Sequence, residues 1–268
     1  GEIGAGAPLG RLICDACAKL GIELADDDIL VVAQKIVSKS EGRIVRLDQI
    51  EPSERARQLA RELDKDAALV EVILGESRSV IRSGSRALIV ETHHGFVCAN
   101  AGVDQSNVGL GVVALLPQDP DRAAAAIREY IHRQTDRRVG VIISDSFGRA
   151  WRIGTVDVAV GVAGLRPVKD ERGLTDRHGY ELKAAVAAIA DEIAGAAELV
   201  MGKRDGVPAP AFEARPVTGG ERRYLVEEEQ LGIETPPDIA MPVLELQHAT
   251  DPGARDPAPL GQRLRIGV

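Results

Sequence analysis

Two aspartates that follow apolar runs are the side chains best placed for chemistry in this sequence. Asp104 lies in the polar stretch 102–107, and Asp145, followed by Ser146, comes directly after the apolar run 139–144. Carboxylates at the ends of buried strands can hold Mg²⁺ or Mn²⁺, which prefer oxygen ligands, and a serine hydroxyl can add another ligand. Aspartate also favours turns. Metal binding and turn capping therefore both remain open from the spacing alone.

A lysine with small polar neighbours follows a different apolar run. Lys39 stands beside Ser38 in the stretch 34–43, where its ammonium group could meet a nucleotide phosphate as a point charge. A solvated turn would explain the same residues. The sequence has no G-x-x-x-x-G-K-[ST] motif, which excludes a P-loop.

The single tryptophan lies between two arginines in the stretch 149–157. Arg149 and Arg152 could clamp a phosphate or carboxylate through paired hydrogen bonds, and Trp151 could stack on a flat ring or a guanidinium group. The alternative is a surface loop held by an Arg–Asp pair. Neither interpretation is favoured by the sequence.

Neither the histidine pair nor the cysteine pair is strong evidence for a metal site. His93 and His94 are adjacent in a predicted strand, so their side chains point to opposite faces and cannot easily share one ion. We expect a structural role for both. Cys14 and Cys17 form a C-x-x-C without a second pair at zinc spacing, and we expect them to pack in a core.

The elements that must position these residues alternate between strand-like and helical patterns, which predicts a mixed α/β fold. Continuous apolar runs indicate buried strands, and amphipathic runs indicate helices. The pattern predicts helices near 9–17, 53–63, 66–74, 120–134 and 181–198, and strands at 28–33, 79–82, 87–91, 95–98 and 139–144. No linker separates two independent domains. We expect one catalytic domain over residues 1–218 and a Pro-rich, charged extension of open role over 219–268.

The bulk composition excludes several classes of protein. The formal net charge of −8 over 268 residues argues against a nucleic-acid-binding protein, which needs a basic face. No run approaches the roughly 20 apolar residues that span a bilayer, so we expect no membrane partner. Three cysteines cannot all pair. The cytoplasm is therefore the expected location.

Three of these stretches together resemble the signature blocks of the coenzyme F420-0:L-glutamate ligases. The blocks are 34–43, 101–107 and 145–152, and the third continues through Gly154 and Asp157 as it does in that family. They stand in the family's order and at similar separations. The resemblance extends along the chain up to the tail that begins near residue 219.

The resemblance implies an enzyme that uses GTP to join the carboxylate of the coenzyme's lactyl phosphate arm to the amino group of L-glutamate. Later rounds would add further glutamates through γ-linkages. It also implies two divalent metal ions, Mg²⁺ or Mn²⁺, together with K⁺. The implied structure is a distinctive α/β ligase fold that works as an intertwined homodimer.

Matched motif by motif, the resemblance also implies roles for individual residues. The implied metal ligands are Asp104, Asp145 and Ser146. The implied nucleotide contacts are Glu2, Ile3, Gln34, Lys39, Asn107, Gly202 and Lys203. Some relatives place a metal-binding Gln near the position of Lys203, which puts the second metal site in doubt here. Arg149 and Arg152 are the candidate catalytic residues that hold the anionic arm of the coenzyme.

Two other functions would use the same residues. A metal-dependent phosphatase or phosphotransferase could use the two aspartates without any amide-bond chemistry. A nucleotide-binding protein without turnover would need only the phosphate and metal contacts. Phosphoryl transfer depends mainly on positioning and charge neutralisation, so the residues do not separate these readings without the resemblance.

Overall fold

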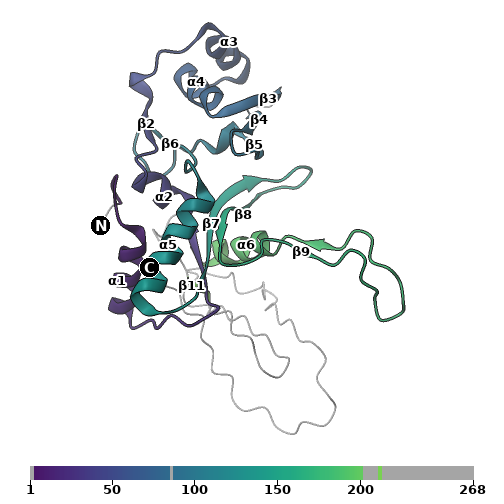
Figure 1. Cartoon of the computed structure of the whole chain (residues 1–268). Coiled ribbons are helices and arrows are strands. Elements are labelled where there is room, and N and C mark those ends of the chain that lie inside the picture. Colours follow the sequence, from purple (N-terminus) through teal and green to yellow (C-terminus); the bar gives the residue numbers. More distant parts are fainter. Residues whose placement is uncertain (1–2, 85–86, 202–210, 213–268) are drawn as a thin grey trace, which may run out of the picture.

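The computed structural model of the chain describes residues 3–84, 87–201 and 211–212 (Figure 1). Within these residues the fold is mixed α/β, with six α-helices and several small sheets, as the sequence pattern predicted. None of the described helices is both long and apolar enough to cross a bilayer. The predicted extension 219–268 lies outside the described residues.

The lower part of the molecule is built on a four-stranded sheet with the order β11–β1–β7–β8. Its strands are β1 (Ile29–Ala33), β7 (Gly140–Gly148), β8 (Thr155–Ala163) and β11 (Ala211–Phe212). β1 runs parallel to β7, whereas β8 and β11 are antiparallel to their neighbours. β1 and the first half of β7 are almost fully buried, as expected for strands covered on both faces.

Helices cover both faces of this sheet. One face packs against α1 (Leu9–Leu20) and α5 (Pro120–Thr135), and the other packs against α6 (Ile189–Met201). Asp119 caps α5 by accepting a hydrogen bond from the backbone N–H of Arg122, and Pro120 takes the first helical position. The N-terminus of α5 lies so close to β8 that a Cβ at Gly161 would sit 2.5 Å from the backbone of Pro120.

A second lobe is inserted between β1 and β7 and forms the upper part of Figure 1. It carries its own apolar core, which is separate from the two clusters that flank the four-stranded sheet. Ser53 and Asp66 each cap a helix of this lobe through a side-chain oxygen. The elements of the insertion, in chain order, are α2 (Gln34–Ser40), β2 (Ile44–Arg46), a 3₁₀ turn (Leu47–Gln49), α3 (Glu54–Leu63), α4 (Ala67–Gly75), β3 (Ser77–Gly84), β4 (Ala87–Thr92), β5 (Val97–Ala99), a second 3₁₀ turn (Asn100–Gly102) and β6 (Val112–Ala114).

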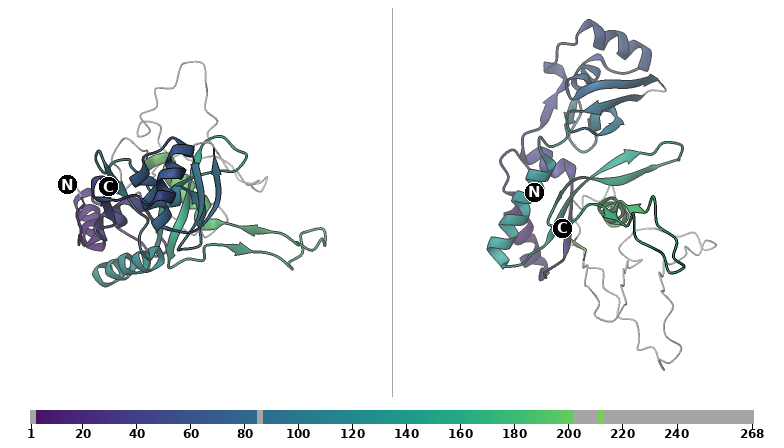
Figure 2. Two further views of the ribbon diagram at one scale, coloured as in Figure 1. Left: turned by 90° about the horizontal axis from the view of Figure 1, so that it is seen from above. Right: turned by 45° about the vertical axis from the view of Figure 1, so that its right-hand side comes forward.

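The two lobes are joined by the antiparallel pair of β2 and β6. β3, β4 and β5 form a separate antiparallel sheet with α3 and α4 packed beside it (Figures 1 and 2). The chain therefore leaves the end of β1, builds the upper lobe and returns through β6 before α5 leads into β7. This route places the loop between β5 and β6 above the sheet, near the middle of β7.

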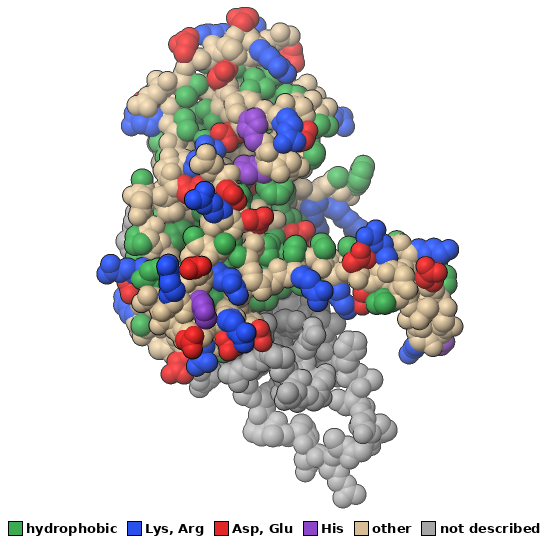
Figure 3. All heavy atoms as spheres, viewed as in Figure 1, with side chains coloured by type: hydrophobic (Ala, Val, Ile, Leu, Met, Phe, Trp, Pro, Cys, Tyr) green, Lys and Arg blue, Asp and Glu red, His purple; other side chains and the backbone are tan. Residues whose placement is uncertain are grey.

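An exposed arm formed by residues 166–188 projects from the body of the molecule (Figures 1–3). Its two short strands, β9 (Lys169–Asp170) and β10 (Val186–Ala187), pair in antiparallel fashion. Backbone hydrogen bonds continue the pairing toward the tip, where the N–H of Leu182 donates to the carbonyl of Leu174. Most of the arm is exposed to solvent.

The sequence predicted most of these elements, and three predictions need correction. The predicted helix 181–198 begins only at Ile189, because residues 181–187 pair with the opposite side of the arm. The stretch after β1 is the helix α2 where a solvated turn was the simpler expectation. β7 also continues past residue 144, since β8 pairs with it as far as Gly148.

Candidate functional site

The structure brings Asp104 and Asp145 to the same place, although they come from different lobes. Asp104 lies in the loop between β5 and β6, where its backbone pairs with Ala114. Asp145 lies in β7, one residue beyond Ser144, which is the last residue of β7 that pairs with β1. The negative charge of Asp104 raises the pKa of Asp145. The two carboxylates therefore belong to one polar region, and metal binding there stays a prediction.

Asp104 is held in its charged form by a lysine and a serine. Lys35 Nζ lies 2.8 Å from one carboxylate oxygen and also donates to Ser106 Oγ at 2.7 Å. The backbone N–H and hydroxyl of Ser106 donate to Asp104 at 2.7 and 3.0 Å. Partial burial raises the pKa of Asp104, but the hydrogen bonds from Lys35 and Ser106 outweigh burial and leave the pKa below its ordinary value.

Asp145 is in the opposite electrostatic state. Burial raises its pKa to about 7, and the negative charges of Asp104 and Asp157 push in the same direction. The backbone N–H of Ser146 and the charge of Lys35 only partly oppose this rise. A carboxylate that is buried among other carboxylates is stabilised when a cation binds beside it, so this position favours a cation.

The donor set fits a divalent cation that keeps some ligands for water or substrate. The described residues hold no group of three His, Cys, Asp or Glu side chains arranged around one ion. Asp104 and Asp145 would therefore supply two carboxylates, and the remaining ligands would come from elsewhere. Mg²⁺ is commonly bound in this way, through one or two carboxylates together with water and phosphate oxygens.

Ser146 and Ser144 form a second polar cluster with Asp157 of β8. The Ser146 hydroxyl donates to one carboxylate oxygen of Asp157 at 2.5 Å, and the Ser144 hydroxyl donates to the other at 3.0 Å. Ser144 and Asp157 are buried, whereas Ser146 is partly accessible. Glu198 of α6 accepts from the backbone N–H of Asp157 at 3.2 Å. This cluster lies beside the predicted metal ligands on β7.

The predicted nucleotide-binding residues differ in how accessible they are. Gln34 is buried, and its amide nitrogen donates to Ser38 Oγ and to the carbonyl of Leu115, both at 3.0 Å. Its role there is structural support for α2. Lys39 at the end of α2 is half-buried, and Asn107 is exposed in the loop that carries Asp104.

The remaining predicted nucleotide contacts lie at the ends of the described chain. Ile3 is half-buried and packs against the apolar cluster between the sheet and α5. Glu2, Gly202 and Lys203 lie outside the described residues, so their predicted contacts remain predictions. α6 ends at Met201, directly before Gly202 and Lys203 in the chain.

The two candidate catalytic arginines lie at the tip of the β7–β8 hairpin. Arg149 donates through Nη2 to the carbonyl of Ile153 at 2.8 Å, which closes the turn. Arg152 is exposed, and Trp151 is fully exposed with a relative accessibility of 101%. The tip therefore presents two cations and a large ring to solvent, beyond the carboxylate of β7. The Arg–Asp pair expected for a surface loop is not formed among the described residues, because Arg149 bonds to Ile153 and Asp157 bonds to two serines of β7; the anion clamp stays a prediction.

The histidine pair makes structural contacts, although His93 and His94 lie in the turn between β4 and β5 and not in a strand as predicted. His93 Nε2 lies 3.0 Å from the carbonyl oxygen of Gly75, and His94 Nε2 lies 2.8 Å from that of Pro117. Cys14 and Cys17 are free thiols on α1. Burial raises the pKa of both thiols, which keeps them protonated and unreactive at neutral pH.

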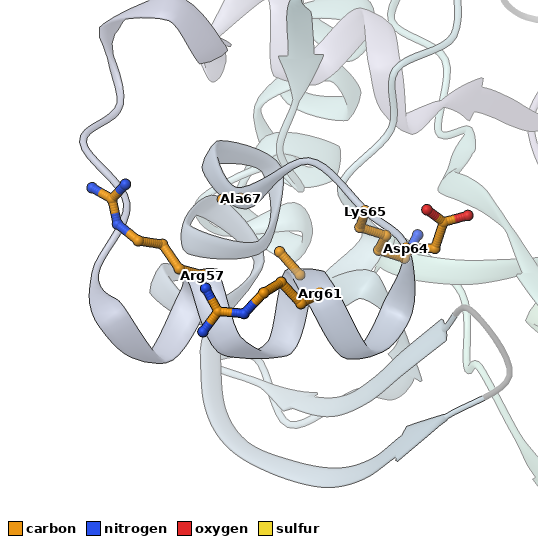
Figure 4. A pocket seen from close by; sticks show the side chains of 6 residues that line it. Arg57, Arg61, Asp64, Lys65 and Ala67 are labelled. Atoms are coloured by element: carbon orange, nitrogen blue, oxygen red, sulfur yellow. The ribbon is translucent and has the colours of Figure 1, made fainter.

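A surface hollow on α3 and α4 lies away from all of these residues (Figure 4). It is lined by Arg57, Ala60, Arg61, Asp64, Lys65 and Ala67. Arg57 is paired with Glu51, and Arg61 lies 3.4 Å from Glu54. We place the functional site at Asp104 and Asp145, because perturbed carboxylates are better evidence for chemistry than an open hollow lined by paired side chains.

Two residues of the site lie in stretches that the sequence analysis singled out, but they were given no role there. Lys35 was overlooked because its segment was not read as a helix; on α2 it lies one turn before Lys39. Asp157 stands alone as a charge within the apolar strand Thr155–Ala163. A buried charge in such a strand needs hydrogen-bond partners, which is the signal that could have identified it.

Comparisons with known proteins match the part of the chain that contains this site. The model of the family described as F420-0:Gamma-glutamyl ligase matches residues 1–212. A Coenzyme F420:L-glutamate ligase of Methanothermobacter thermautotrophicus is 49% identical over 215 residues, which are 80% of this chain and 85% of the relative. The ligase of the same name from Methanocaldococcus jannaschii is 44% identical over 206 residues, covering 76% and 82%. That of Archaeoglobus fulgidus is 42% identical over 214 residues, covering 78% and 86%.

Proposed function

The chain belongs to the F420-0:gamma-glutamyl ligase family, and we propose that it joins L-glutamate to coenzyme F420-0 through an amide bond at the expense of GTP. Further rounds add glutamates through γ-linkages. The observation that carries the proposal is the meeting of Asp104 and Asp145, with Lys35, at the junction of the two lobes. Both aspartates come from the sequence blocks that resemble this family.

Amide formation from a carboxylate needs an activated acyl group, and GTP supplies the activation. A carboxylate oxygen of the coenzyme attacks the γ-phosphorus, and the bond from that phosphorus to GDP breaks, which gives an acyl phosphate. The amino nitrogen of glutamate then attacks the acyl carbon. Phosphate leaves with the former carboxylate oxygen, and the amine releases a proton. Such a sequence needs no nucleophile from the protein.

The carboxylates of this site suit that chemistry. Asp104 and Asp145 would hold a divalent cation, Mg²⁺ or Mn²⁺, and Ser146 would contribute to a second one. Cations held by these residues would supply neutralisation of the charge that develops on phosphate oxygens during phosphoryl transfer. Lys35 keeps Asp104 ionised, and so keeps it ready to act as a ligand. K⁺ is the monovalent cation that we include in the proposal from the family resemblance.

We assign the nucleotide to the side of the site formed by α2 and the Asp104 loop. Lys39 and Asn107 would contact GTP there, and Gln34 would support α2 from inside. Glu2, Ile3, Gly202 and Lys203 complete the proposed nucleotide contacts. Arg149 and Arg152 would hold the anionic arm of the coenzyme from the hairpin tip, where both side chains are exposed.

We also propose that the enzyme acts as a homodimer. The arm of residues 166–188 exposes several apolar side chains, among them Leu174 and Tyr180 with relative accessibilities of 56% and 62%. An isolated two-stranded hairpin is marginally stable in water. Packing of the arm against a second copy of the chain would bury this surface. Light scattering coupled to size-exclusion chromatography tests the dimer, and a monomer at micromolar concentration would contradict it.

The ligase proposal is tested by an assay that contains GTP, Mg²⁺ or Mn²⁺, K⁺, L-glutamate and coenzyme F420-0, with the product mass as readout. We expect a gain of one or more glutamyl units only when all substrates are present. Release of phosphate from GTP without a gain in mass would favour a phosphatase instead. Nucleotide binding without either product would point to a protein that binds nucleotide without turning it over.

A further inference from the structure

One face of β7 lies toward α6 and carries a polar cluster. The hydrogen bonds of this cluster fix the direction in which the Ser146 hydroxyl points. Side chains two residues apart on a strand project to the same face. Ile142 packs against α6, so Ser144 and Ser146 face the same side, whereas Asp145 faces the other. In the pairing of β7 with β8, Ser146 lies directly opposite Asp157.

Asp157 orients both serine hydroxyls. Its carboxylate accepts from Ser146 Oγ at 2.5 Å through one oxygen and from Ser144 Oγ at 3.0 Å through the other. An ionised carboxylate has no proton to give, so both serines must be donors in these bonds. Asp157 has a relative accessibility of only 5%, and its own backbone N–H is held by Glu198.

A serine hydroxyl that donates its single hydrogen can offer only lone pairs to any other partner. Ser144 is buried at 2% accessibility, so its oxygen is out of reach of a ligand. Ser146 is partly accessible, and it directly follows Asp145 in the chain. The contact with Asp157 therefore converts Ser146 from a group that can donate or accept into one that presents lone pairs only.

From this geometry we propose that Asp157 is a positioning residue, which holds the Ser146 hydroxyl as an oxygen ligand for a divalent cation bound with the nucleotide. The inference rests on the proposed function, and it adds a residue that the family-like motifs did not assign. Asp157 itself touches neither the cation nor the substrate. It acts through Ser146, and its charge also adds to the negative field around Asp145.

The competing role for Asp157 is purely structural: its hydrogen bonds would act as a clamp that holds β7 and β8 together. However, a neutral pair of side chains would hold two strands together without the cost of burying a charge. The two roles also differ in what they predict. A clamp changes the stability of the hairpin and leaves cation binding intact, whereas a positioning residue changes cation binding only as long as Ser146 is present.

The test measures the affinity of the full chain for Mn²⁺ by electron paramagnetic resonance, in the presence of a non-hydrolysable GTP analogue. The variants are Asp157→Ala, Ser146→Ala and the double variant, with Ser144→Ala as the matched control. Ser144→Ala removes the other hydroxyl held by Asp157 but not the proposed ligand. Thermal melting of every variant reports the structural contribution separately.

We expect Asp157→Ala and Ser146→Ala each to weaken Mn²⁺ binding by about 10- to 100-fold, the range typical for partners that orient metal ligands. The double variant should be no weaker than Ser146→Ala alone, since residues that act through one another are not additive. Ser144→Ala should lower the melting temperature and keep the wild-type affinity. Ser146→Thr, which retains a hydroxyl, should also keep it.

Unchanged Mn²⁺ affinity in folded Asp157→Ala, or additive losses in the double variant, would overturn the inference and leave the ligase proposal standing. If Asp157→Ala shows no cooperative melt, Asp157→Asn provides the same test with a side chain of the same size. There we expect a loss of at least about threefold, because an amide offers one acceptor oxygen for two hydroxyls. A wild-type chain that binds no Mn²⁺ with the analogue would overturn this inference together with the metal part of the proposed function.

Discussion

The Asp104 loop and the β7 strand supply carboxylates to the same site, but they hold them in opposite electrostatic states. Asp104 is compensated within the chain, by Lys35 at 2.8 Å and by two hydrogen bonds from Ser106. Asp145 is partly buried, the backbone N–H of Ser146 and the charge of Lys35 do not offset the cost of its burial, and its neighbours Asp104 and Asp157 are negative as well. The pKa of Asp104 is accordingly lowered, whereas that of Asp145 is raised to about 7.

This difference indicates a division of labour between the two regions. The loop provides a carboxylate that is ionised with or without a cation. The strand provides one whose ionisation at neutral pH is favoured by a bound cation. We therefore expect the loss of Asp145 to weaken cation binding more than the loss of Asp104. The predictions below test this division, beginning with the largest expected effect.

Removal of the strand carboxylate should have the largest effect on turnover. Asp145→Ala deletes a ligand for the cation that neutralises the transferring phosphate, and we expect kcat to fall by at least about a thousandfold, comparable to losses seen when charge-stabilising groups are removed. The measurement is the rate of glutamyl addition followed by product mass. The melting temperature of the variant serves as the control for folding. A rate within tenfold of wild type would exclude Asp145 as a ligand.

The stability of the metal-free protein should depend on pH through Asp145. The folded protein holds a proton on Asp145 up to about pH 7, whereas the unfolded chain releases it near the ordinary value of 3.8. Stability is therefore greatest below pH 4 as far as this group is concerned, and it falls as the pH rises from about 4 to about 7. The free energy of unfolding should drop by on the order of 2–4 kcal/mol across that window.

Denaturant unfolding in EDTA at several pH values measures this dependence. Asp145→Asn mimics the protonated form, so it should flatten the slope between pH 4 and 7 and stabilise the metal-free protein at pH 8. Addition of Mn²⁺ should stabilise the wild type at pH 8 and leave Asp145→Asn nearly unchanged. An equal slope in both proteins would show that other groups cause the pH dependence.

Removal of the Lys35 charge should make the electrostatic state of Asp104 resemble that of Asp145. Lys35→Met leaves Asp104 without its ion pair, so its pKa should rise, and the pKa of Asp145 should rise with it, because Lys35 lowers both. We expect kcat/KM to fall by about 10- to 100-fold and the pH profile of activity to move to higher pH. Lys35→Arg keeps the charge and is the matched control. A profile that moves equally in both variants would contradict the role of the Lys35 charge.

The elements that the sequence predicted best are those with strong local signals. α3 and α4 begin after Ser53 and Asp66, whose side chains accept from the backbone N–H groups of Ala56 and Leu69. Such capping residues are visible in a sequence. The apolar run of β1 was recognised for a similar reason, since only a strand covered on both faces shows it.

The elements that the sequence missed depend on contacts between distant residues. α2 has no side-chain cap and is only seven residues long. It is held in place by Ser38, whose hydroxyl donates to the carbonyl of Leu115, 77 residues away. The alanine-rich stretch 181–187 was predicted as a helix, but helix propensity differs by less than about 1 kcal/mol per residue and yields to the strand pairing of the arm.

The same reasoning explains what could be predicted of the site. Asp104 and Asp145 were recognisable because each follows an apolar run in a polar, family-like block. Their electrostatic difference was not, since it arises from the burial of Asp145 and from the hydrogen bonds of Lys35 and Ser106 to Asp104, which depend on how the two lobes meet. Sequence blocks thus identified the candidate ligands, whereas the groups that change their pKa values required the fold.

The smallest expected effect concerns the hairpin tip, which extends the comparison from metal ligands to substrate contacts. Arg149→Ala and Arg152→Ala each remove a cation proposed to hold the coenzyme's anionic arm, and a hydrogen bond to a charged group contributes about 1.5–3 kcal/mol. Because the tip lies beyond the carboxylates, we expect KM for coenzyme F420-0 to rise by about tenfold or more while kcat changes little.

Steady-state kinetics with the coenzyme as the varied substrate separate these two constants. Arg133→Ala, on the exposed side of α5 and paired with Glu129, is the matched control for loss of a surface charge. A fall in kcat without a change in KM would place the arginines among the groups that act on the transferring phosphate. That result would merge the hairpin tip with the carboxylates of Asp104 and Asp145 into one catalytic unit, because both would then act only in the transition state.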